Sequence, residues 1–370
     1  MKKYIWESKN WHKFEFDYKT IMELLSKARL IQGNLLGKVS ALDIHLETEA
    51  QAAVLVEEAV RTAEIEGMKL NRNAVRSSVA IKLGLPHGFG VKIERNVDGL
   101  VDVLLDAIRS HNKPLTLKRL NGWHAALFQT GYSGLHKIHV AELRDNSPMR
   151  VVSGPIGKEK IHFEAPSHTQ MKNEIKLFLD WWNCSLGKTD GILRAASAHL
   201  RFLTIHPYED GNGRIARVLT DMALAQDEKS NIRFYSISSQ IMKKRNEYYS
   251  ILEKVQNCRI DVTNWFVWFL ETFTKAVDDS QNIIANVFRK AEFWKEHQHT
   301  TLNERQRKVI EKLLESDSEG FKGGLTTRKY VGITKTSRAT AFREIDDLKE
   351  KGIIRYVGGK GRSVSYEINW

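Results

Sequence analysis

Cysteine, proline and long apolar runs are scarce in this chain of 370 residues. Its two cysteines, Cys184 and Cys258, are too few for a disulfide framework or a thiolate zinc site. No stretch approaches 18 uninterrupted apolar residues, which excludes a transmembrane helix. The first residues hold two lysines without an apolar segment behind them, which argues against a secretory signal. We therefore expect a cytoplasmic protein.

The rest of the composition is that of a globular protein with a basic excess. The chain is 42% hydrophobic and 28% charged, which argues against a disordered or fibrous protein, and its length suggests two or three domains. The net charge of +12 indicates a polyanionic partner such as nucleic acid, a membrane surface or nucleotide phosphates. Residues 302–370 alone carry a net +5, so the C-terminal fifth is more basic per residue.

Most of the chain has a helical pattern. In residues 20–36 the apolar positions fall on one helical stripe, and residues 50–67 are rich in strong helix formers. Two β-prone runs at 149–163 flank a Gly-Pro-Ile-Gly turn, which indicates a hairpin inside an otherwise helical protein. We expect a mainly α fold, with further helices at 98–110, 169–182, 191–205, 213–226, 239–257 and 262–293.

The strongest chemical signal is the segment HPYEDGNGRIAR, residues 206–217. Pro207 ends the helix expected before it, and Asp210-Gly211-Asn212-Gly213 is the densest turn signal in the chain. Glycine and asparagine tolerate positive φ, so successive backbone N–H groups can point inward ahead of a helix that begins at about Arg214. The pattern therefore predicts an anion cradle at a helix N-terminus.

Four side chains of this segment suit an anion that is a phosphate. Arg214 and Arg217 are three apart on one face of the new helix and add two guanidinium groups. Asp210 is a hard oxygen ligand that suits magnesium bridging to phosphate, and His206 is a titratable base. Together they predict a site for phosphoryl or nucleotidyl transfer.

Two other interpretations of the segment are a calcium loop and a plain surface turn. An EF-hand register with Gly211 at position six puts His206, Tyr208 and Arg217 at ligand positions, and none is a carboxylate. A plain turn accounts for EDGNG but not for the His, the Asp and both Arg residues in register. The chain has no GxxxxGK[ST] sequence, so a Walker-type ATPase is excluded.

HPYEDGNGRIAR resembles the signature of the Fic family, HxFx(D/E)GNGRxxR, at every position but one. The departure is Tyr208 where the family usually has Phe, and its hydroxyl needs a partner in the core. Relatives with Lys at the position of Gly213 run phosphate transfer from the opposite end of the nucleotide. With Gly213 in place, the resemblance implies transfer of AMP from ATP to a protein hydroxyl.

The resemblance also implies a role for each residue of the segment. His206 would be the general base that deprotonates a Tyr, Thr or Ser hydroxyl of the target protein. Asp210 would bind Mg²⁺, Arg214 would contact the β end of the ATP phosphates, and Arg217 would contact the γ-phosphate. The anion hole for the α and β phosphates would be formed by Gly211, Asn212 and Gly213.

Three features outside the segment fit the same resemblance. The hairpin at 149–163 is similar to the family's flap, whose edge can pair with an extended target segment; a solvated hairpin without a role is the alternative. Tyr248 and Gln256 share one face of a helix and take the positions of the family's adenine contacts, with Gln in place of Asn. Core packing is the alternative for Tyr248.

Residues 62–67, TAEIEG, match the motif (S/T)xxxE(G/N) of Fic proteins that carry their own inhibitor. Thr62 and Glu66 are four apart on a helix, so they face the same way. The resemblance implies that Glu66 pairs with Arg217 and occupies the guanidinium that the γ-phosphate needs. Ordinary solvated helix charges are one alternative, and support for removal of AMP is another.

The basic C-terminal segment resembles a winged helix-turn-helix. Helices are expected at 302–315, 325–333 and 337–354, and a hairpin at 355–368. The polar stretch at 295–303 is expected to be a linker or a helix start.

The third of these helices carries charges of both signs. Lys360 and Arg362 on the wing would contact phosphate, whereas Asp346, Asp347 and Glu350 weigh against DNA and leave docking of a protein as the alternative. The residues that would open the helix and reach the major groove in DNA-binding members are Ser337, Arg338, Thr340 and Arg343.

These expectations define three regions and one activity. We expect an N-terminal helical region with the inhibitory helix at 1–95, a Fic catalytic core at 96–295 and a winged helix-turn-helix domain at 302–370. The activity would be that of a protein adenylyltransferase inhibited by Glu66, with ATP, Mg²⁺ and a target protein hydroxyl, its own included, as partners. DNA would bind at 302–370, and no membrane partner is expected. The alternative is a DNA-binding transcriptional regulator whose Fic core senses nucleotide, and the oligomeric state, a homodimer included, stays open.

Overall fold

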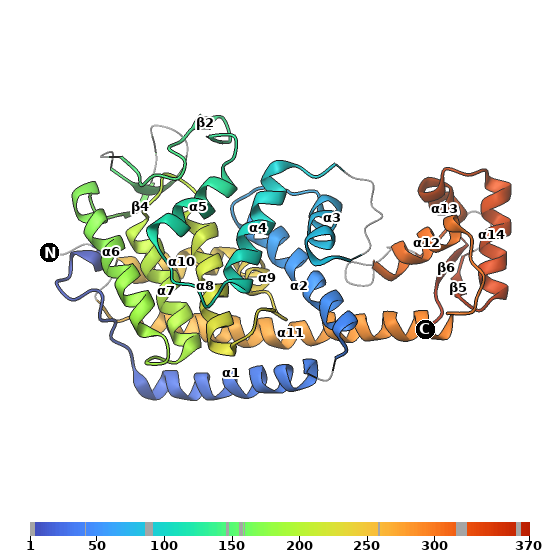
Figure 1. Cartoon of the computed structure of the whole chain (residues 1–370), viewed down its shortest axis with the longest axis horizontal. Helices are drawn as coiled ribbons and strands as arrows, with labels where there is room; N and C mark the ends of the chain where they lie inside the picture. The colour runs from blue at the N-terminus through green and yellow to red at the C-terminus, as the bar shows by residue number, and fades with distance from the viewer. Residues whose placement is uncertain are drawn as a thin grey trace. The chain divides into compact units, whose positions relative to one another are not determined.

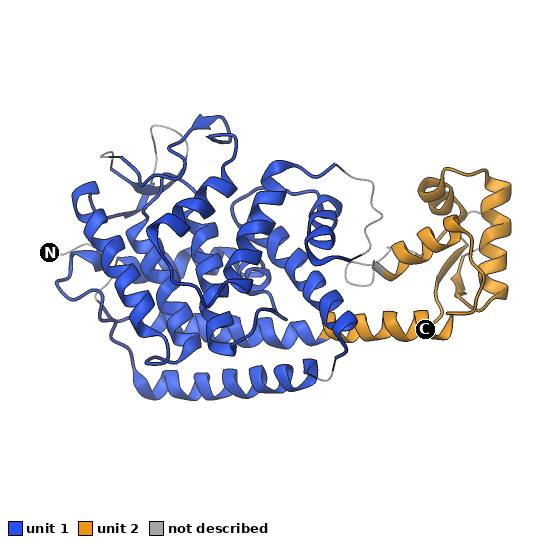
Figure 2. Cartoon of the chain, viewed as in Figure 1, with its two compact units in different colours: residues 1–281 blue, residues 282–370 orange. Residues whose placement is uncertain are grey.

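The computed structural model describes residues 4–40, 42–85, 92–145, 148–154, 158, 160–257, 260–315, 324–359 and 364–370. The fold is mainly helical, which confirms the expected fold class. The chain divides into two compact units, residues 1–281 and 282–370 (Figure 2). No helix in the described part of the chain is long and apolar enough to cross a membrane.

Unit 1 contains most of the helices (Figure 1). They are η1 (Ile5–Glu7), α1 (Tyr18–Val39), α2 (Ile44–Ile65), α3 (Arg72–Leu83), α4 (Arg95–Arg109), α5 (Leu117–Leu127), α6 (His168–Ser185), α7 (Gly191–Ile205), α8 (Asn212–Glu228), α9 (Ile237–Lys243), α10 (Arg245–Gln256) and α11 (Thr263–Glu296), which continues into unit 2. The single helix expected at 239–257 is in fact two, because Lys244 leaves the helical conformation with φ −115° and ψ 32°. The break lets α9 pack on α2 while α10 packs on β4 (Lys160–Glu164).

Helices α7 and α8 form the centre of unit 1. Every residue of α7 is buried, and α8 is buried from Arg214 to Ala225. A helix that is buried all round has to be surrounded by other elements, and α2, α4, α5 and α6 pack against this pair (Figure 1). The short connection between α7 and α8 is the segment singled out by the sequence, so its side chains are positioned from both ends by the core.

Two small antiparallel hairpins belong to unit 1. The first pairs β1 (Tyr132–Ser133) with β2 (His136–Lys137). The second pairs β3 (Arg150–Ser153) with β4 (Lys160–Glu164) and confirms the hairpin expected at 149–163. Its turn, residues 155–157, lies outside the described residues, as does Cys258.

Unit 2 contains the end of α11, three further helices and a hairpin. The elements are α12 (Glu304–Glu315), α13 (Thr327–Thr334), α14 (Arg338–Glu350), β5 (Ile354–Gly358) and β6 (Ser365–Ile368). Strands β5 and β6 are antiparallel, and Leu325 makes an antiparallel bridge to Tyr366 of β6. An apolar core holds these elements together, and it includes Val309, Ile310, Tyr330, Ala341, Ile345, Leu348 and Ile354. Lys360 and Arg362 lie outside the described residues.

Candidate active site

His206 is the first residue after α7. It takes the left-handed conformation, with φ 50° and ψ 60°, and Pro207 prevents the helix from continuing. Its Nδ1 lies 3.2 Å from the carbonyl oxygen of Leu203. A carbonyl can only accept, so Nδ1 carries the proton and Nε2 keeps its lone pair. Burial lowers the pKa of His206 to about 4, so the imidazole is a neutral base at pH 7.

Arg144 holds the backbone on which His206 sits, and the sequence reasoning missed it. This fully buried guanidinium donates through Nε to the carbonyl oxygen of His206, at 2.8 Å, and through Nη2 to that of Pro166. Its backbone N–H donates to the carbonyl oxygen of Pro207, at 2.9 Å. The available sequence signal was weak: an arginine followed by turn residues, 62 positions before the histidine.

Asn212 closes the loop between the two central helices. Its side-chain oxygen accepts from the backbone N–H of Tyr208 at 3.0 Å, and its amide donates back to the Tyr208 carbonyl at 2.7 Å. The Tyr208 ring is fully buried and stacks on His124, with ring centroids 4.3 Å apart. Its hydroxyl donates to the side chain of Asn121 at 2.7 Å, which confirms the expectation that this Tyr needs a partner. The Asn212 side chain therefore shapes the loop, and only its backbone N–H is left for an anion.

The first turn of α8 presents the expected cradle. Gly211 is its N-cap at φ 81°, and a Cβ there would lie 2.7 Å from the ring of Phe128. The N–H groups of the first turn have no partner within the helix. The Arg214 guanidinium lies over the Phe128 ring at 4.5 Å, and its buried Nε has no hydrogen-bond partner in the described part of the chain. Free donors of this kind at a helix N-terminus suit a multiply charged anion.

Asp210 lies beside the start of α8 and is partly exposed. Its side chain is 43% exposed; one carboxylate oxygen accepts from Ser133, and the other accepts from the Gly211 N–H at 2.5 Å. Its backbone carbonyl accepts from Nε2 of the buried His124, at 3.2 Å. Among the described residues no group of three His, Cys, Asp or Glu side chains could hold a metal. A cation beside Asp210 would therefore take most of its ligands from the substrate and water, which is how Mg²⁺ binds.

Arg217 contacts the expected inhibitory helix directly. Its Nη2 lies 2.6 Å from Oε1 of Glu66, and its Nε donates to the hydroxyl of Thr62 at 2.6 Å. The Arg217 side chain is 3% exposed, whereas that of Glu66 is 30% exposed. The buried Nη1 of Arg217 has no hydrogen-bond partner among the described residues. A Cβ on Gly213 would lie 2.3 Å from Oε1 of Glu66, so only glycine permits this approach.

Two residues of α10 hold the end of α2. Nε of Arg245 donates to the carbonyl oxygen of Ile65 at 2.7 Å, and the hydroxyl of Tyr249 donates to the same oxygen at 3.2 Å. Ile65 immediately precedes Glu66, which is the C-cap of α2. We call these two contacts the α10 clamp. The clamp fixes the carbonyl next to Glu66 and so helps to aim its carboxylate at Arg217.

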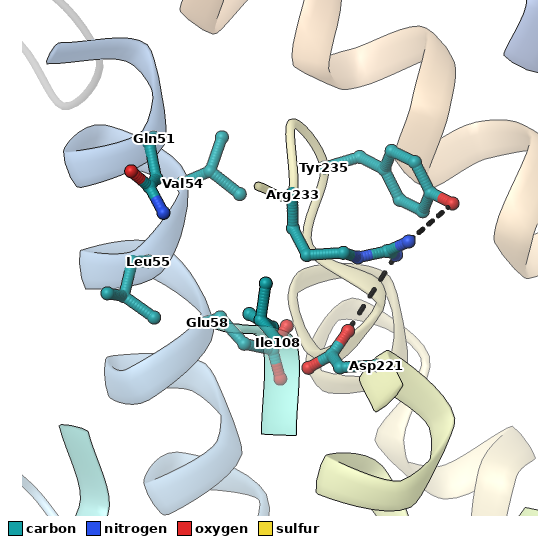
Figure 3. Close-up of a pocket in the computed structure, with 8 residues that line it drawn as sticks. All are labelled: Gln51, Val54, Leu55, Glu58, Ile108, Asp221, Arg233 and Tyr235. Carbon is teal, nitrogen blue, oxygen red and sulfur yellow. Dashed lines mark hydrogen bonds and ion pairs between the residues drawn. The ribbon is translucent and has the colours of Figure 1, made fainter. Parts of the chain in front are cut away.

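A small pocket is lined by α2, by one residue each of α4 and α8, and by Arg233 and Tyr235 (Figure 3). Arg233 points toward the hydroxyl of Tyr235, at 2.9 Å, and toward Asp221, whose carboxylate lies 3.7 Å away. Glu58 of α2 accepts from the hydroxyls of Ser236 and Ser238. This polar cluster anchors the middle of α2 to the core.

Tyr248 and Gln256 lie inside the helical core. The Tyr248 hydroxyl lies 2.8 Å from Nε2 of His199, and its ring packs beside those of Trp265 and Trp268. The Gln256 amide donates to the Thr204 hydroxyl at 3.4 Å. Both side chains are thus engaged with the protein, and their contact with adenine stays a prediction.

Two family models match the chain. One, described as a domain of unknown function (DUF4172), covers residues 4–85, which include Thr62 and Glu66. The other, the Fic/DOC family, covers residues 114–224, which include the flap hairpin and the whole loop around His206. Residues 114–224 form a Fic/DOC domain.

Known proteins are similar to this chain over different shares of its length. The protein adenylyltransferase fic-1 of Caenorhabditis elegans is 38% identical over 63 residues, which are 17% of this chain and only 12% of that protein. A Fic family protein from Desulfovibrio desulfuricans G20 covers 94% of this chain and 95% of its own, with a TM-score of 0.52 and 16% identity.

Two more solved structures share the fold over about three quarters of this chain. Fic-1 residues 134–508 from C. elegans have a TM-score of 0.51 and 18% identity, and cover 73% of this chain and 74% of theirs. A Fic domain containing signaling protein from Bacteroides thetaiotaomicron VPI-5482 has a TM-score of 0.50 and 20% identity, and covers 74% of this chain and 97% of its own. At such identities the likeness is one of fold.

Proposed function

We propose that the chain is a protein adenylyltransferase that transfers AMP from ATP to a Tyr, Thr or Ser hydroxyl of a protein, and that Glu66 inhibits it. The observation that carries the proposal is one loop with a neutral base, His206, at its start and an amide cradle, at the N-terminus of α8, at its end. A partial relative of this Fic domain, fic-1, has the name of a protein adenylyltransferase, which supports the same reaction class.

The proposed reaction uses two sets of groups: His206 acts on the target hydroxyl, and the start of α8 with Arg214 acts on the phosphates. Nε2 of His206 removes the proton of the target hydroxyl as its oxygen attacks the α-phosphorus of ATP. The new oxygen–phosphorus bond forms as the bond to the β-phosphate oxygen breaks, and pyrophosphate leaves. The N–H groups at the start of α8 and the Arg214 guanidinium stabilise the negative charge of the phosphates. His206 can accept the proton of the target hydroxyl because its imidazole starts neutral.

Asp210 would hold Mg²⁺ bound to ATP, since a single exposed carboxylate beside a phosphate cradle fits a cation that keeps several water ligands. When bound, the ion would neutralise charge on the pyrophosphate leaving group. Ser133 and His124 keep Asp210 in place by their contacts with its carboxylate and its backbone carbonyl.

Inhibition by Glu66 follows from competition for one guanidinium. Oε1 of Glu66 takes the Nη2 donor of Arg217 and lies against Gly213, which is the space that the end of the ATP triphosphate requires. A carboxylate and a phosphate cannot share these donors, so ATP binds productively only after Glu66 has moved. The 30% exposure of the Glu66 side chain leaves it a path into solvent.

The test uses ATP labelled at the α-phosphate, Mg²⁺ and a cell lysate. Glu66→Gly should label itself or a lysate protein at least tenfold more than the unsubstituted chain, and adding His206→Ala should abolish the label. Glu64→Ala is the matched control, because Glu64 lies on the same helix but pairs with Arg61. Transfer of a γ-phosphate label instead, or labelling that survives His206→Ala, would contradict the proposal.

A further inference from the structure

We propose that unit 2 binds duplex DNA through the exposed side of α14 and the turn before it. The residues of this surface, which we call the α14 surface, are Lys335, Arg338, Ala339, Phe342 and Arg343. This function is separate from adenylyl transfer and does not rest on it.

The order of elements suits a helix that enters a groove. Helices α13 and α14 are joined by the three residues 335–337, and a β-hairpin follows α14. Ser337 caps α14 by accepting from the Thr340 N–H at 3.1 Å, so the helix begins sharply at Arg338. In helix-turn-helix proteins the second helix of such a pair lies in the major groove, and its N-terminal residues reach the bases.

The charge of this region is of one sign. Residues 324–343 contain five Lys or Arg residues and no Asp or Glu. The exposed side chains of Arg328, Lys335, Arg338 and Arg343 make no hydrogen bond or ion pair within the part of the chain that the structure describes. Four unneutralised cations over two short helices form the electrostatic footprint of a nucleic-acid site.

The acidic residues of α14 lie outside this surface, either held by side chains of α12 and α13 or further along the helix. Glu344 is buried and accepts from Nε of Arg305 at 3.0 Å and from the Tyr330 hydroxyl at 2.7 Å. Asp347 accepts from the Gln306 amide at 2.6 Å. Both carboxylates thus hold α12 and α13 against α14. The exposed acids, Asp346 and Glu350, lie in the C-terminal half of α14, beyond the residues that would reach the bases.

The side chains on the α14 surface are of the types that read base edges. Arg338 and Arg343 have the planar fork that bonds to O6 and N7 of guanine. The Phe342 side chain is 63% exposed, and an exposed aromatic ring on such a helix can contact the methyl group of thymine. Only Phe342 and Ala339 are apolar here, which is too little apolar area for a stable protein interface. The observations therefore favour DNA over a protein partner.

The experiment measures binding of the full chain to a 30-base-pair duplex of random sequence, followed by selection of preferred sequences from that pool. We expect binding that weakens steeply with salt. Arg338→Ala with Arg343→Ala should weaken binding about tenfold or more, and Phe342→Ala should remove a preferred thymine while leaving the salt slope unchanged. Lys335→Ala should lower that slope by about one without altering the selected sequence.

The matched control is Lys312→Ala, which removes one exposed charge from α12. It should bind DNA like the unsubstituted chain, and circular dichroism should show that every variant is folded. Equal weakening by Lys312→Ala would overturn the proposal, because it would mean that any surface charge suffices. Equal competition by poly-glutamate and duplex DNA at matched charge would also overturn it, in favour of an acidic protein partner. So would the absence of measurable DNA binding at low salt.

Discussion

The carboxylate of Glu66 and the guanidinium of Arg217 are 2.6 Å apart although 151 residues separate them in the chain. The arginine is buried in the central helix of the Fic domain, whereas the glutamate caps a helix outside it. An exposed ion pair contributes little to stability, but here the arginine is buried, so loss of its partner costs more. In the proposed function, this pair couples the N-terminal helices to the nucleotide site.

The α10 clamp should strengthen inhibition. Arg245→Ala removes one donor from the Ile65 carbonyl, which frees the end of α2 and should raise adenylyl transfer about two- to tenfold, the worth of roughly one hydrogen bond. Initial rates with labelled ATP measure this. In a Glu66→Gly background the same substitution should have no effect, and Lys254→Ala, on the exposed side of the same helix, should be silent in both. Equal activation in both backgrounds would show that the clamp acts otherwise than through Glu66.

Arg144 should act as a positioning residue for His206. Arg144→Lys keeps the charge but cannot reach the carbonyls of His206 and Pro166 together. In the Glu66→Gly background we expect kcat to fall about tenfold while KM for ATP stays the same, because the base is displaced and the cradle is not. Steady-state kinetics with varied ATP separate the two. A rise in KM at constant kcat would argue against this role.

Two charged residues of the pocket beside α2, Asp221 and Arg233, should differ in their effect on stability. Burial and the neighbouring Glu58 raise the pKa of Asp221 well above its usual range, so its environment disfavours the charged carboxylate. Asp221→Asn should then change the free energy of unfolding by less than about 1 kcal/mol, since it removes a charge that burial disfavours and keeps a polar group of the same size. Arg233→Met should cost about 3–5 kcal/mol, because Glu228 loses its buried partner at 2.9 Å. Urea unfolding compares the two, and equal losses would contradict the assignment.

Buried neutral histidines should make the fold sensitive to mild acid. Burial lowers the pKa of His124 to about 4 and that of His199 to about 3, while an unfolded histidine titrates near 6.5. Between pH 6.5 and 5 the unfolded chain binds protons that the folded chain excludes, so the free energy of unfolding falls with falling pH. Each histidine contributes a slope of up to about 1.4 kcal/mol per pH unit.

Urea unfolding at pH 7, 6 and 5 measures this slope. His199→Gln should reduce it, and His45→Gln, at an exposed position, should leave it unchanged. A stability that is flat over this range would mean that the histidines are protonated in the folded state.

Much of the local structure could be predicted from the sequence, because it depends on neighbours along the chain. Apolar spacing predicted α7 at the residues where it lies, and the turn residues from Asp210 to Gly213 predicted the start of α8 to about two residues. The break at Lys244 was missed because apolar residues continue on both sides of it and only packing against different partners separates α9 from α10.

By itself, the sequence determined which groups are available: a base, a carboxylate, a glycine-rich turn and two arginines within twelve residues, and a glutamate upstream that a family motif marks. Only the tertiary structure decided which distant groups meet them. The contacts of Arg144, Ser133, His124 and Arg245 join residues about 60 to 180 positions apart. It also decided that Glu344 of α14 accepts from Tyr330 and that Asp347 accepts from Gln306. Such contacts follow from how helices pack in three dimensions, and no spacing along the chain encodes them.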